Sequence, residues 1–261
     1  MKSSENQMQR YFIELSYKGT NYKGWQVQNG VETVQLRIDE ALSTVLRENI
    51  HVIGAGRTDT GVHASYFVAH FDSKQDNLDC TSTIFNLNGY LPKDIAIRNI
   101  QKVSSDAHSR FDATSRTYQY NISRTKNPFY NDYSFYVYGE IDIDKMNTAA
   151  NTLIQYEDFS SFCKSKSDVK TKLCNIYQSY WENKGNLLIY HIKANRFLRN
   201  MVRSITGTLL MIGLDKLKPE DIHRIVEARD RKAAGFSAQA KGLFLTDIEY
   251  PPHIFSKSPE I

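Results

Sequence analysis

Residues 54–64 read Gly54-Ala55-Gly56-Arg57-Thr58-Asp59-Thr60-Gly61-Val62-His63-Ala64. The apolar pair Val52 and Ile53 precedes this stretch, and an alternating run from Tyr66 to Phe71 follows it. Alternation is typical of a half-buried strand, so the stretch is predicted to be a loop between two strands. Because glycine tolerates positive φ and close backbone approach, a large flat ligand would have room beside Asp59.

Three known loop motifs do not fit this segment. A dinucleotide fingerprint needs a third glycine where Asp59 stands, and a phosphate-binding loop needs Gly-Lys-Ser/Thr after its glycines. The triplet Asp59-Thr60-Gly61 also occurs in aspartic proteases, but these enzymes use two carboxylates that share a proton, and this chain has one such triplet. From the residues alone, a simple turn in which Asp59 accepts hydrogen bonds from neighbouring amides remains an equal alternative.

The same loop resembles an enzyme motif. Gly-Arg-Thr-Asp-x-Gly-Val-His-Ala, residues 56–64, is similar to the active-site loop of the TruA family, the tRNA pseudouridine synthases that act on positions 38, 39 and 40. Further similar segments follow in family order from Tyr17 to Tyr250. The resemblance implies that Asp59 is the catalytic nucleophile. It also implies that Arg57 either fills the gap left by a flipped base or contacts phosphate.

Length and composition are those of an ordinary globular protein. The chain has 261 residues, of which 41% are hydrophobic and 24% charged. No apolar run approaches the roughly 20 residues that span a bilayer. The segment Met1 to Arg10 is polar and lacks an apolar signal sequence. We therefore expect a cytoplasmic protein with no membrane association.

The cysteines and histidines do not indicate a metal site. The three cysteines are an odd number with no Cys-x-x-Cys, and the seven histidines include no His-Glu-x-x-His. We expect neither a metal nor another cofactor. The formal net charge of +4 is compatible with a local RNA-binding patch but does not establish one.

Hydrophobic periodicity predicts an alternation of strands and helices in the first part of the chain. The helix from Thr33 to Arg47 has the clearest pattern, with apolar residues at i, i+4, i+7 and i+8. The order is strand, helix, strand, strand, helix, strand. The other expected elements are strands at 11–17, 52–53, 66–71 and 95–103 and a helix at 82–91.

The second part is predicted to contain similar elements in a similar order, without a repeated sequence motif. We place the boundary near Ser104, so that 1–104 and 105–261 form two halves. The stretch 125–140 is expected to be a surface connection. The expected elements are strands at 117–122, 173–181, 187–194 and 240–250 and helices at 142–155, from 194 onward and at 218–229.

Two further residues are singled out by the resemblance. The segment Arg116-Thr117-Tyr118-Gln119-Tyr120 is similar to the family's Arg-x-Tyr-x-Tyr, whose first tyrosine lies against the target uridine. The alternative for Tyr118 is a buried tyrosine with a satisfied hydroxyl. Leu243 matches a position that packs against the target base. Many relatives have a proline where Gln239 stands, so the geometry of that turn is left open.

Arg203 is the candidate partner of Asp59. On a helix beginning at Ala194, Arg196, Arg199 and Arg203 would form one stripe. Without further context, such a stripe is more typical of a solvated basic face than of a functional site. A nearby arginine lowers a carboxyl pKa by about 1–3 units and keeps it ionised in a closed site. The family's Ala-Asn-x-Phe-Leu-x-x-Met-Val-Arg segment supplies such a cation, and Arg203 is the matching position.

The resemblance implies a fold and an activity. The expected fold is α+β: two similar α/β halves forming a mostly antiparallel mixed sheet flanked by helices. The expected protein is a homodimer that isomerises uridine in the tRNA anticodon arm, and one carboxylate suffices for that reaction without a cofactor. Two alternatives remain: a catalytically silent RNA-binding or chaperone protein of the same fold, and a uridine isomerase with another RNA target.

The sequence leaves some points of the chemistry open. Asp59 can attack either C1′ of the sugar or the base. A lysine cluster could meet phosphate or simply form a solvated loop. Its members are Lys164, Lys166, Lys170 and Lys172.

Overall fold

The computed structural model describes residues 8–75, 77–164 and 170–255. The chain forms two compact units, which we describe separately. Unit 1 comprises the residues up to Thr114 and those from Asp247 onward, and unit 2 comprises Ser115–Thr246. The predicted halves, with their boundary near Ser104, stay a prediction about how the chain divides into domains.

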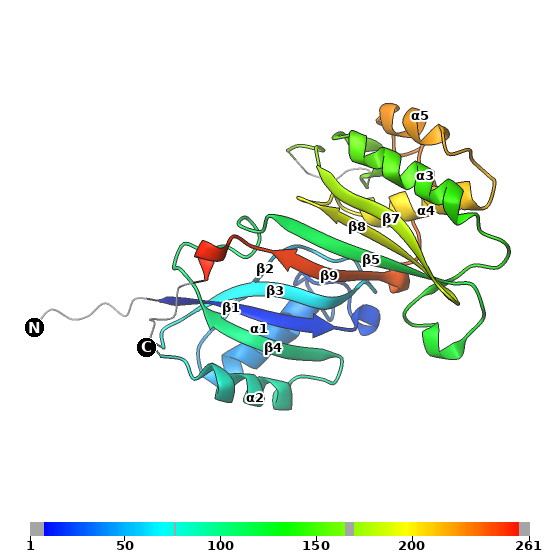
Figure 1. The fold of residues 1–261 in the computed structure, drawn as a ribbon. Helices are drawn as coiled ribbons and strands as arrows, with labels where there is room; N and C mark the ends of the chain where they lie inside the picture. The colour runs from blue at the N-terminus through cyan, green and yellow to red at the C-terminus, as the bar shows by residue number, and fades with distance from the viewer. Residues whose placement is uncertain (1–7, 76, 165–169, 256–261) are drawn as a thin grey trace, which may run out of the picture. The chain divides into compact units, whose positions relative to one another are not determined.

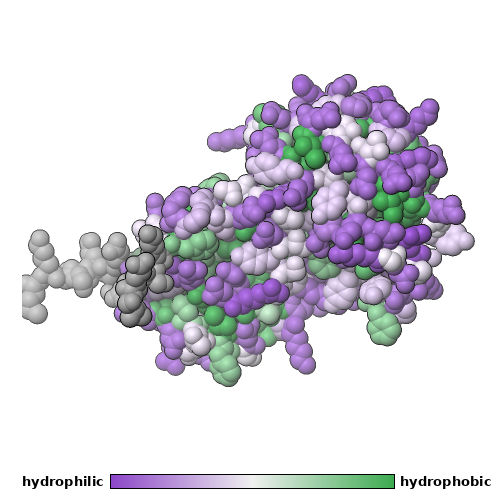
Figure 2. Space-filling view, in the orientation of Figure 1, coloured by the Kyte–Doolittle hydropathy of each residue, from purple (hydrophilic) through white to green (hydrophobic). Residues whose placement is uncertain are grey.

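The described residues form nine strands and five α-helices. The strands make a mixed, mostly antiparallel sheet, which together with the flanking helices confirms the predicted α+β class. None of these described helices is both long and apolar enough to cross a bilayer. The face in Figure 2 is largely hydrophilic, with separate apolar patches.

Unit 1 is built around its first strand. Strand β1 (Gln9–Tyr17) pairs antiparallel with β3 (His63–Ser73) on one side and β4 (Ile95–Lys102) on the other. The short β2 (Ile53–Gly54) extends β3. Helix α2 (Cys80–Tyr90) packs along β4 and against α1 (Val34–Leu46), as Figure 1 shows. The fully buried core of this unit includes Ile13, Leu15, Ile38, Leu42, Phe67 and Phe71.

Helix α1 begins and ends where its sequence predicts. The Thr33 hydroxyl accepts a hydrogen bond from the Leu36 amide at 3.3 Å, which satisfies one of the unpaired donors of the first turn. Arg47 adopts a left-handed conformation with φ 56° and ends the helix. The predicted apolar face is buried through Val34, Ile38, Ala41 and Leu42.

Unit 2 has a similar set of elements. Strand β8 (Leu187–Ala194) lies between β5 (Ser115–Ser123) and β7 (Ile176–Lys184), antiparallel to both. The predicted β7–β8 hairpin is confirmed, and Gly185 supplies the positive φ of its turn. Helix α3 (Ile143–Thr152) packs on β7 and on α4 (Met201–Gly213), while α5 (Asp221–Glu227) packs on α3.

Two further strands complete the sheet, a two-residue and a seven-residue strand. Strand β6 (Phe135–Tyr136) pairs with β5 in parallel, within the stretch predicted to be a surface connection. Strand β9 (Leu243–Glu249) begins in unit 2 and ends in unit 1.

The predicted start of the helix after β8 is wrong. Residues up to Ala194 still belong to β8, and α4 begins at Met201. Asn200 has φ 67°, a left-handed conformation that cannot continue a helix backward and that asparagine tolerates better than most residues. Arg196 and Arg199 therefore precede the helix, and no helical stripe joins them to Arg203.

Candidate active site

Asp59 lies in a tight turn of unit 1, in the loop between β2 and β3. The Val62 amide donates to the Asp59 carbonyl at 3.1 Å, and Gly61 has φ +78° while Thr60 does not have a positive φ. This is the pattern of a type II turn, which requires glycine at its third position. The Asp59 side chain is half-buried. Asp59 thus lies in a turn, but the hydrogen bond of this turn is made by its backbone carbonyl, so the alternative in which its side chain accepts from neighbouring amides stays a prediction.

The residue before Asp59, Thr58, is held by two hydrogen bonds. The Thr58 hydroxyl and the Tyr17 hydroxyl lie 2.8 Å apart in a hydrogen bond that is buried from solvent. The Thr58 carbonyl accepts from the Trp25 amide at 3.2 Å. Trp25 is 2% exposed and stacks on Phe67 at 4.0 Å between ring centroids, so it is a core residue beneath the loop. This core fixes the position of Asp59.

Two glycines outside the loop let the chain pass close to the turn. A Cβ at Gly24, which has φ +93°, would lie 2.5 Å from the Thr58 carbonyl oxygen. A Cβ at Gly19 would lie 2.0 Å from the Val62 carbonyl oxygen. Both distances are far inside van der Waals contact, so any larger residue would push the turn away from β1.

The glycines within the loop differ in what they leave open. A Cβ at Gly54 would lie 2.6 Å from the Trp25 ring, so the bare backbone of Gly54 is covered by that ring. A Cβ at Gly56 would meet nothing within 4 Å. Of these two glycines, Gly56, next to the exposed Arg57, therefore has open space beside its backbone, and Gly54 does not. The room for a ligand beside Asp59 stays a prediction.

His63 is a structural residue that sequence reasoning did not single out. Its side chain is 1% exposed, and its Nδ1 accepts a hydrogen bond from the Gly19 amide at 3.1 Å. This contact joins the end of β1 to the start of β3, directly after the turn. The sequence feature that could have indicated this role is the position of His63 in the glycine loop motif, because a buried histidine needs a hydrogen-bond partner.

In unit 2, Tyr118 and Tyr120 have different surroundings. Tyr118 is half-buried on β5, and its ring meets the edge of Phe197 with centroids 5.1 Å apart. Tyr120 is fully buried, and its hydroxyl donates to the Gln239 carbonyl at 2.7 Å. Burial raises the pKa of Tyr120. The core tyrosine with a satisfied hydroxyl is thus Tyr120, whereas Tyr118 keeps accessible surface.

Arg203 is held by the neighbouring segment 236–238, which has no regular secondary structure. Its Nε donates to the Ala238 carbonyl at 2.7 Å, and the Ala238 amide donates to the Arg203 carbonyl at 3.0 Å. A Cβ at Gly207, one turn further along α4, would lie 1.8 Å from the Phe236 carbonyl oxygen. Gly207 therefore allows the segment 236–238 to lie directly on α4. Sequence reasoning missed this support because it joins residues with no shared periodicity.

Leu243 and the turn before it complete the predicted set. Leu243 is 5% exposed and is the first residue of β9. Gln239 has φ −59° and ψ 139°, and proline fixes φ near −65°, so glutamine here adopts the backbone that a proline would impose. The Tyr120 ring would lie 2.8 Å from a Cβ at Gly242, which fixes the turn against β5.

The structure groups these residues within each unit. Unit 1 carries Arg57 and Asp59, and unit 2 carries Tyr118, Arg203 and Leu243. The approach of Arg203 to Asp59 joins the two units and stays a prediction. Of the lysine cluster, the exposed Lys164 donates its amide to the Arg199 carbonyl at 3.0 Å, so these two basic residues are neighbours. Lys166 lies outside the described residues.

This combination defines a class of protein: an α+β fold with a half-buried aspartate in a glycine turn on one unit and a tyrosine and an arginine on the other. The sequence model of the family described as "tRNA pseudouridine synthase" matches residues 15–112 and 149–251. The chain belongs to this family, whose members are isomerases, and the predicted membership is confirmed. The matched ranges include Arg57, Asp59, Arg203 and Leu243, while Tyr118 lies between them.

Individual relatives are similar to this chain over nearly their whole length. The chain is 50% identical over 253 residues to the tRNA pseudouridine synthase A of Bacteroides thetaiotaomicron, covering 96% of this chain and 94% of the relative. It is 48% identical over 249 residues to the protein of the same name from Bacteroides fragilis, covering 95% and 99%. The protein of that name from Francisella tularensis is 38% identical over 252 residues, covering 96% and 97%.

Proposed function

We propose that this enzyme isomerises uridine to pseudouridine at positions 38, 39 and 40 in the anticodon stem-loop of tRNA, with Asp59 as the nucleophile. The observation that carries the proposal is the half-buried carboxylate, held in a type II turn and anchored through Thr58, in a chain of this family. The reaction breaks the bond from the ribose to N1 of uracil and forms a bond to C5. No atom is gained or lost, and no electron acceptor is required.

The residues of the two units have complementary roles in this proposal. The uridine leaves its stack, at a cost of a few kcal/mol, and enters a pocket where Tyr118 and Leu243 pack against it. Arg203 keeps Asp59 ionised and oriented, since an adjacent cation favours the charged form of a carboxylate. Arg57 is exposed beside the open space at Gly56, where it either replaces the flipped base or contacts phosphate.

The assembly and location are part of the same proposal. The chain acts as a homodimer that holds one tRNA between its subunits, and it works in the cytoplasm, where tRNA is processed. The support is the tRNA named as the substrate of the relatives that match nearly the whole chain.

Mapping of pseudouridine in tRNA tests the substrate. Unmodified tRNA transcripts that keep a uridine at only one of positions 38, 39 and 40 are incubated with the purified protein. We expect pseudouridine at each of the three positions and none elsewhere in the tRNA. Pseudouridine at other sites would assign a different RNA target. Tight binding without any pseudouridine would assign a silent RNA-binding protein of the same fold.

A further inference from the structure

Unit 1 carries an exposed aromatic side chain that the site described above does not use. Phe111 is 74% exposed and lies in the loop between β4 and β5, next to the exposed Arg110. The guanidinium carbon of Arg110 lies 5.6 Å from the centre of the Phe111 ring, within cation–π range. An apolar ring that stays exposed to water contributes little to the stability of the fold. The placement of Phe111 beside a cation therefore points to a role other than stability.

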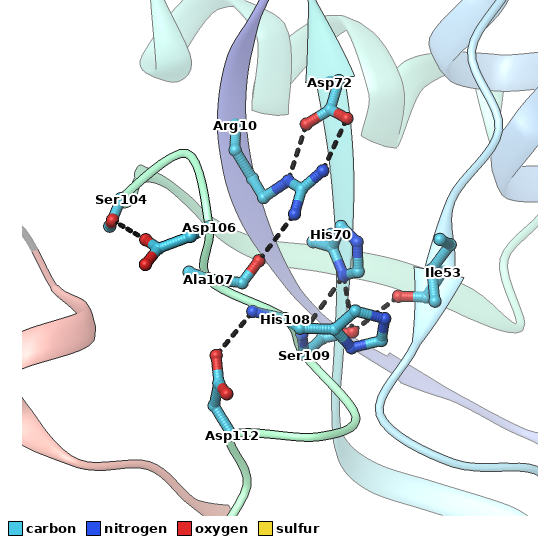
Figure 3. A network of polar contacts seen from close by, with 10 residues as sticks. All are labelled: Arg10, Ile53, His70, Asp72, Ser104, Asp106, Ala107, His108, Ser109 and Asp112. Carbon is cyan, nitrogen blue, oxygen red and sulfur yellow. Dashed lines mark hydrogen bonds and ion pairs between the residues drawn. The ribbon is translucent and has the colours of Figure 1, made fainter.

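The backbone of this loop is fixed by its own side chains. His108 Nδ1 lies 3.1 Å from the Arg110 amide and 3.3 Å from the Phe111 amide, and it accepts from both. The Asp112 carboxylate accepts from the His108 amide at 2.6 Å, as Figure 3 shows. The His108 ring also lies 4.3 Å from the Phe111 ring between centroids. Phe111 is therefore exposed on a loop of defined shape, with His108 against its ring.

A buried network fixes the loop to the strands of unit 1 (Figure 3). The Ser109 amide donates to His70 Nδ1 at 3.2 Å, and the Ser109 hydroxyl lies 2.8 Å from the same nitrogen. The hydroxyl also donates to the Ile53 carbonyl at 2.7 Å, and the Tyr250 hydroxyl donates to the Ser109 carbonyl at 2.6 Å. His70 and Ser109 are both almost fully buried. The amide and hydroxyl of Ser109 therefore hold the loop on β2 and β3, and its carbonyl is bound by Tyr250.

A second contact holds the loop one residue earlier. Arg10 on β1 donates to the Ala107 carbonyl at 3.0 Å. The same guanidinium makes two hydrogen bonds of 2.7 and 2.8 Å to the Asp72 carboxylate on β3. Two-point pairing of this kind fixes the direction of the guanidinium as well as its position. The loop is thus fastened to β1, β2 and β3 together.

This attachment places the loop close to the catalytic turn of the same unit. Ile53 begins β2 and stands six residues before Asp59. Six residues span at most about 22 Å even when fully extended. An RNA that reaches Asp59 therefore passes within a few nucleotides of the loop that carries Phe111.

We propose that Phe111 is an RNA-binding residue that stacks on an unpaired nucleotide of the bound tRNA, with Arg110 contacting the phosphate of that nucleotide. Exposed aromatic rings and arginine are the side chains that bind splayed-out bases and backbone phosphate. Protein–protein interfaces are depleted in serine and aspartate. The exposed neighbours of Phe111 on this loop are all polar or charged: Ser104, Ser105, Asp106, Arg110 and Thr114. The proposal rests on the proposed function, because it needs tRNA as the ligand.

Tryptophan fluorescence tests the stacking directly. The natural tryptophans, Trp25 and Trp181, are 2% and 4% exposed, so the indole of Phe111→Trp would be the accessible one. We expect added tRNA to quench its emission and to shield it from iodide. The matched control is Phe85→Trp on α2, since Phe85 is a 79% exposed phenylalanine of the same unit. No quenching at residue 111, or equal quenching at both residues, would overturn the proposal.

Affinity measurements separate this proposal from the proposed function. Loss of one stacked base corresponds to about a 5- to 150-fold weaker Kd for tRNA, which we expect for Phe111→Ala. Phe111→Tyr should retain the wild-type Kd, and neither substitution should change the melting temperature. A Phe111→Ala protein that binds tRNA as wild type does, while the wild type forms pseudouridine, would overturn only the stacking proposal. A wild type that forms no pseudouridine would overturn the proposed function.

Discussion

At the scale of single residues, the position of Asp59, the proposed nucleophile, depends on the residue that precedes it. Thr58 is bonded through both its hydroxyl and its carbonyl, and its hydroxyl partner is Tyr17 of β1. A carboxylate that attacks a substrate must be held within a fraction of an ångström of its productive position. The hydrogen bond between Tyr17 and Thr58 is therefore expected to affect catalysis as well as stability.

Tyr17→Phe tests this coupling. Loss of the hydroxyl leaves the buried Thr58 hydroxyl without this partner, so we expect a loss of about 1–3 kcal/mol in the free energy of unfolding. We also expect kcat to fall while the Kd for tRNA changes little. The control is Tyr190→Phe, which removes the buried bond between Tyr190 and Ser179 in unit 2. If Tyr17→Phe and Tyr190→Phe lose equal stability and have the same kcat, the Tyr17 hydroxyl has no role in positioning Asp59.

His70 makes the stability of unit 1 depend on pH. Burial lowers its pKa to about 4, and the charges of Arg10 and His108 act in the same direction. Between pH 4 and the ordinary histidine value near 6.5, the unfolded chain binds a proton that the folded chain does not bind. Stability is then fully present above about pH 6.5 and is lost as the pH falls toward 4.

Urea unfolding at pH 7.5 and pH 4.5 measures this contribution. The full shift corresponds to a ceiling of about 3 kcal/mol. We expect wild type to lose more stability between the two values than His70→Gln does, because glutamine does not titrate. Wild type and His70→Gln have the same carboxylates, so the difference between their stability losses excludes the contribution of carboxylate protonation. Equal losses would mean that His70 is not held neutral by its buried contacts.

At the scale of secondary-structure elements, α4 supports Arg203 through Gly207. Gly207→Ala would place a methyl group 1.8 Å from the Phe236 carbonyl oxygen. We expect about 1–3 kcal/mol of destabilisation from overpacking and a lower kcat, because the segment that holds Arg203 must move. Gly89→Ala on α2 is the control, since its methyl group would meet nothing within 4 Å.

Thermal unfolding of the two glycine variants distinguishes the cause. Gly89→Ala should stabilise by about 0.4–1 kcal/mol, because alanine has less backbone freedom to lose on folding. Its kcat should equal that of wild type. A Gly207→Ala protein as stable and as active as wild type would contradict the close contact between α4 and the segment 236–238.

The same scale shows which elements the sequence predicts well. The ends of α1 follow from a threonine cap and an apolar face, both of which are local. The start of α4 was misplaced because the apolar period continues backward through Phe197 and Leu198, while the conformation of Asn200 interrupts the helix. The parallel pairing of β6 was missed because a two-residue strand carries no period. Local signals predict elements, and single backbone angles decide where they stop.

Some residues of the candidate site could be predicted from the sequence and others could not, because only some of them depend on local signals. Asp59 stands in a contiguous motif, so its turn and its glycines were visible in the sequence. The supports of Arg203 come from Ala238 and Gly207, which are distant in sequence or lack a side chain. The stabilising roles of Tyr17 and His63 also depend on partners far along the chain. Contacts of this kind form only in the tertiary structure, and no periodic pattern in the sequence indicates them.

At the scale of the whole molecule, tRNA binding should depend strongly on salt although the net charge is only +4. Exposed basic residues are gathered at Lys164 and Arg199 and in the loop at Arg110. Each phosphate contact contributes about 0.7–0.9 to the slope of log affinity against log salt concentration.

Titrations of tRNA at several salt concentrations measure this slope. We expect a steep, nearly linear dependence for wild type and a slope smaller by about 0.7–0.9 for Arg199→Gln. Arg224→Gln is the control, because Arg224 is exposed on α5 and paired with Asp221. An affinity that does not change with salt would contradict electrostatic binding of the tRNA backbone.

The central claim is that Asp59 performs the reaction, and single-turnover formation of pseudouridine by Asp59→Asn tests it most directly. Asparagine keeps the shape of the side chain and removes its charge, and Asp144→Asn on the exposed side of α3 is the matched control. We expect Asp59→Asn to bind tRNA with a Kd within about fivefold of wild type and to lose turnover by more than about 1,000-fold, while Asp144→Asn behaves as wild type. An Asp59→Asn rate within about tenfold of wild type would contradict the assignment.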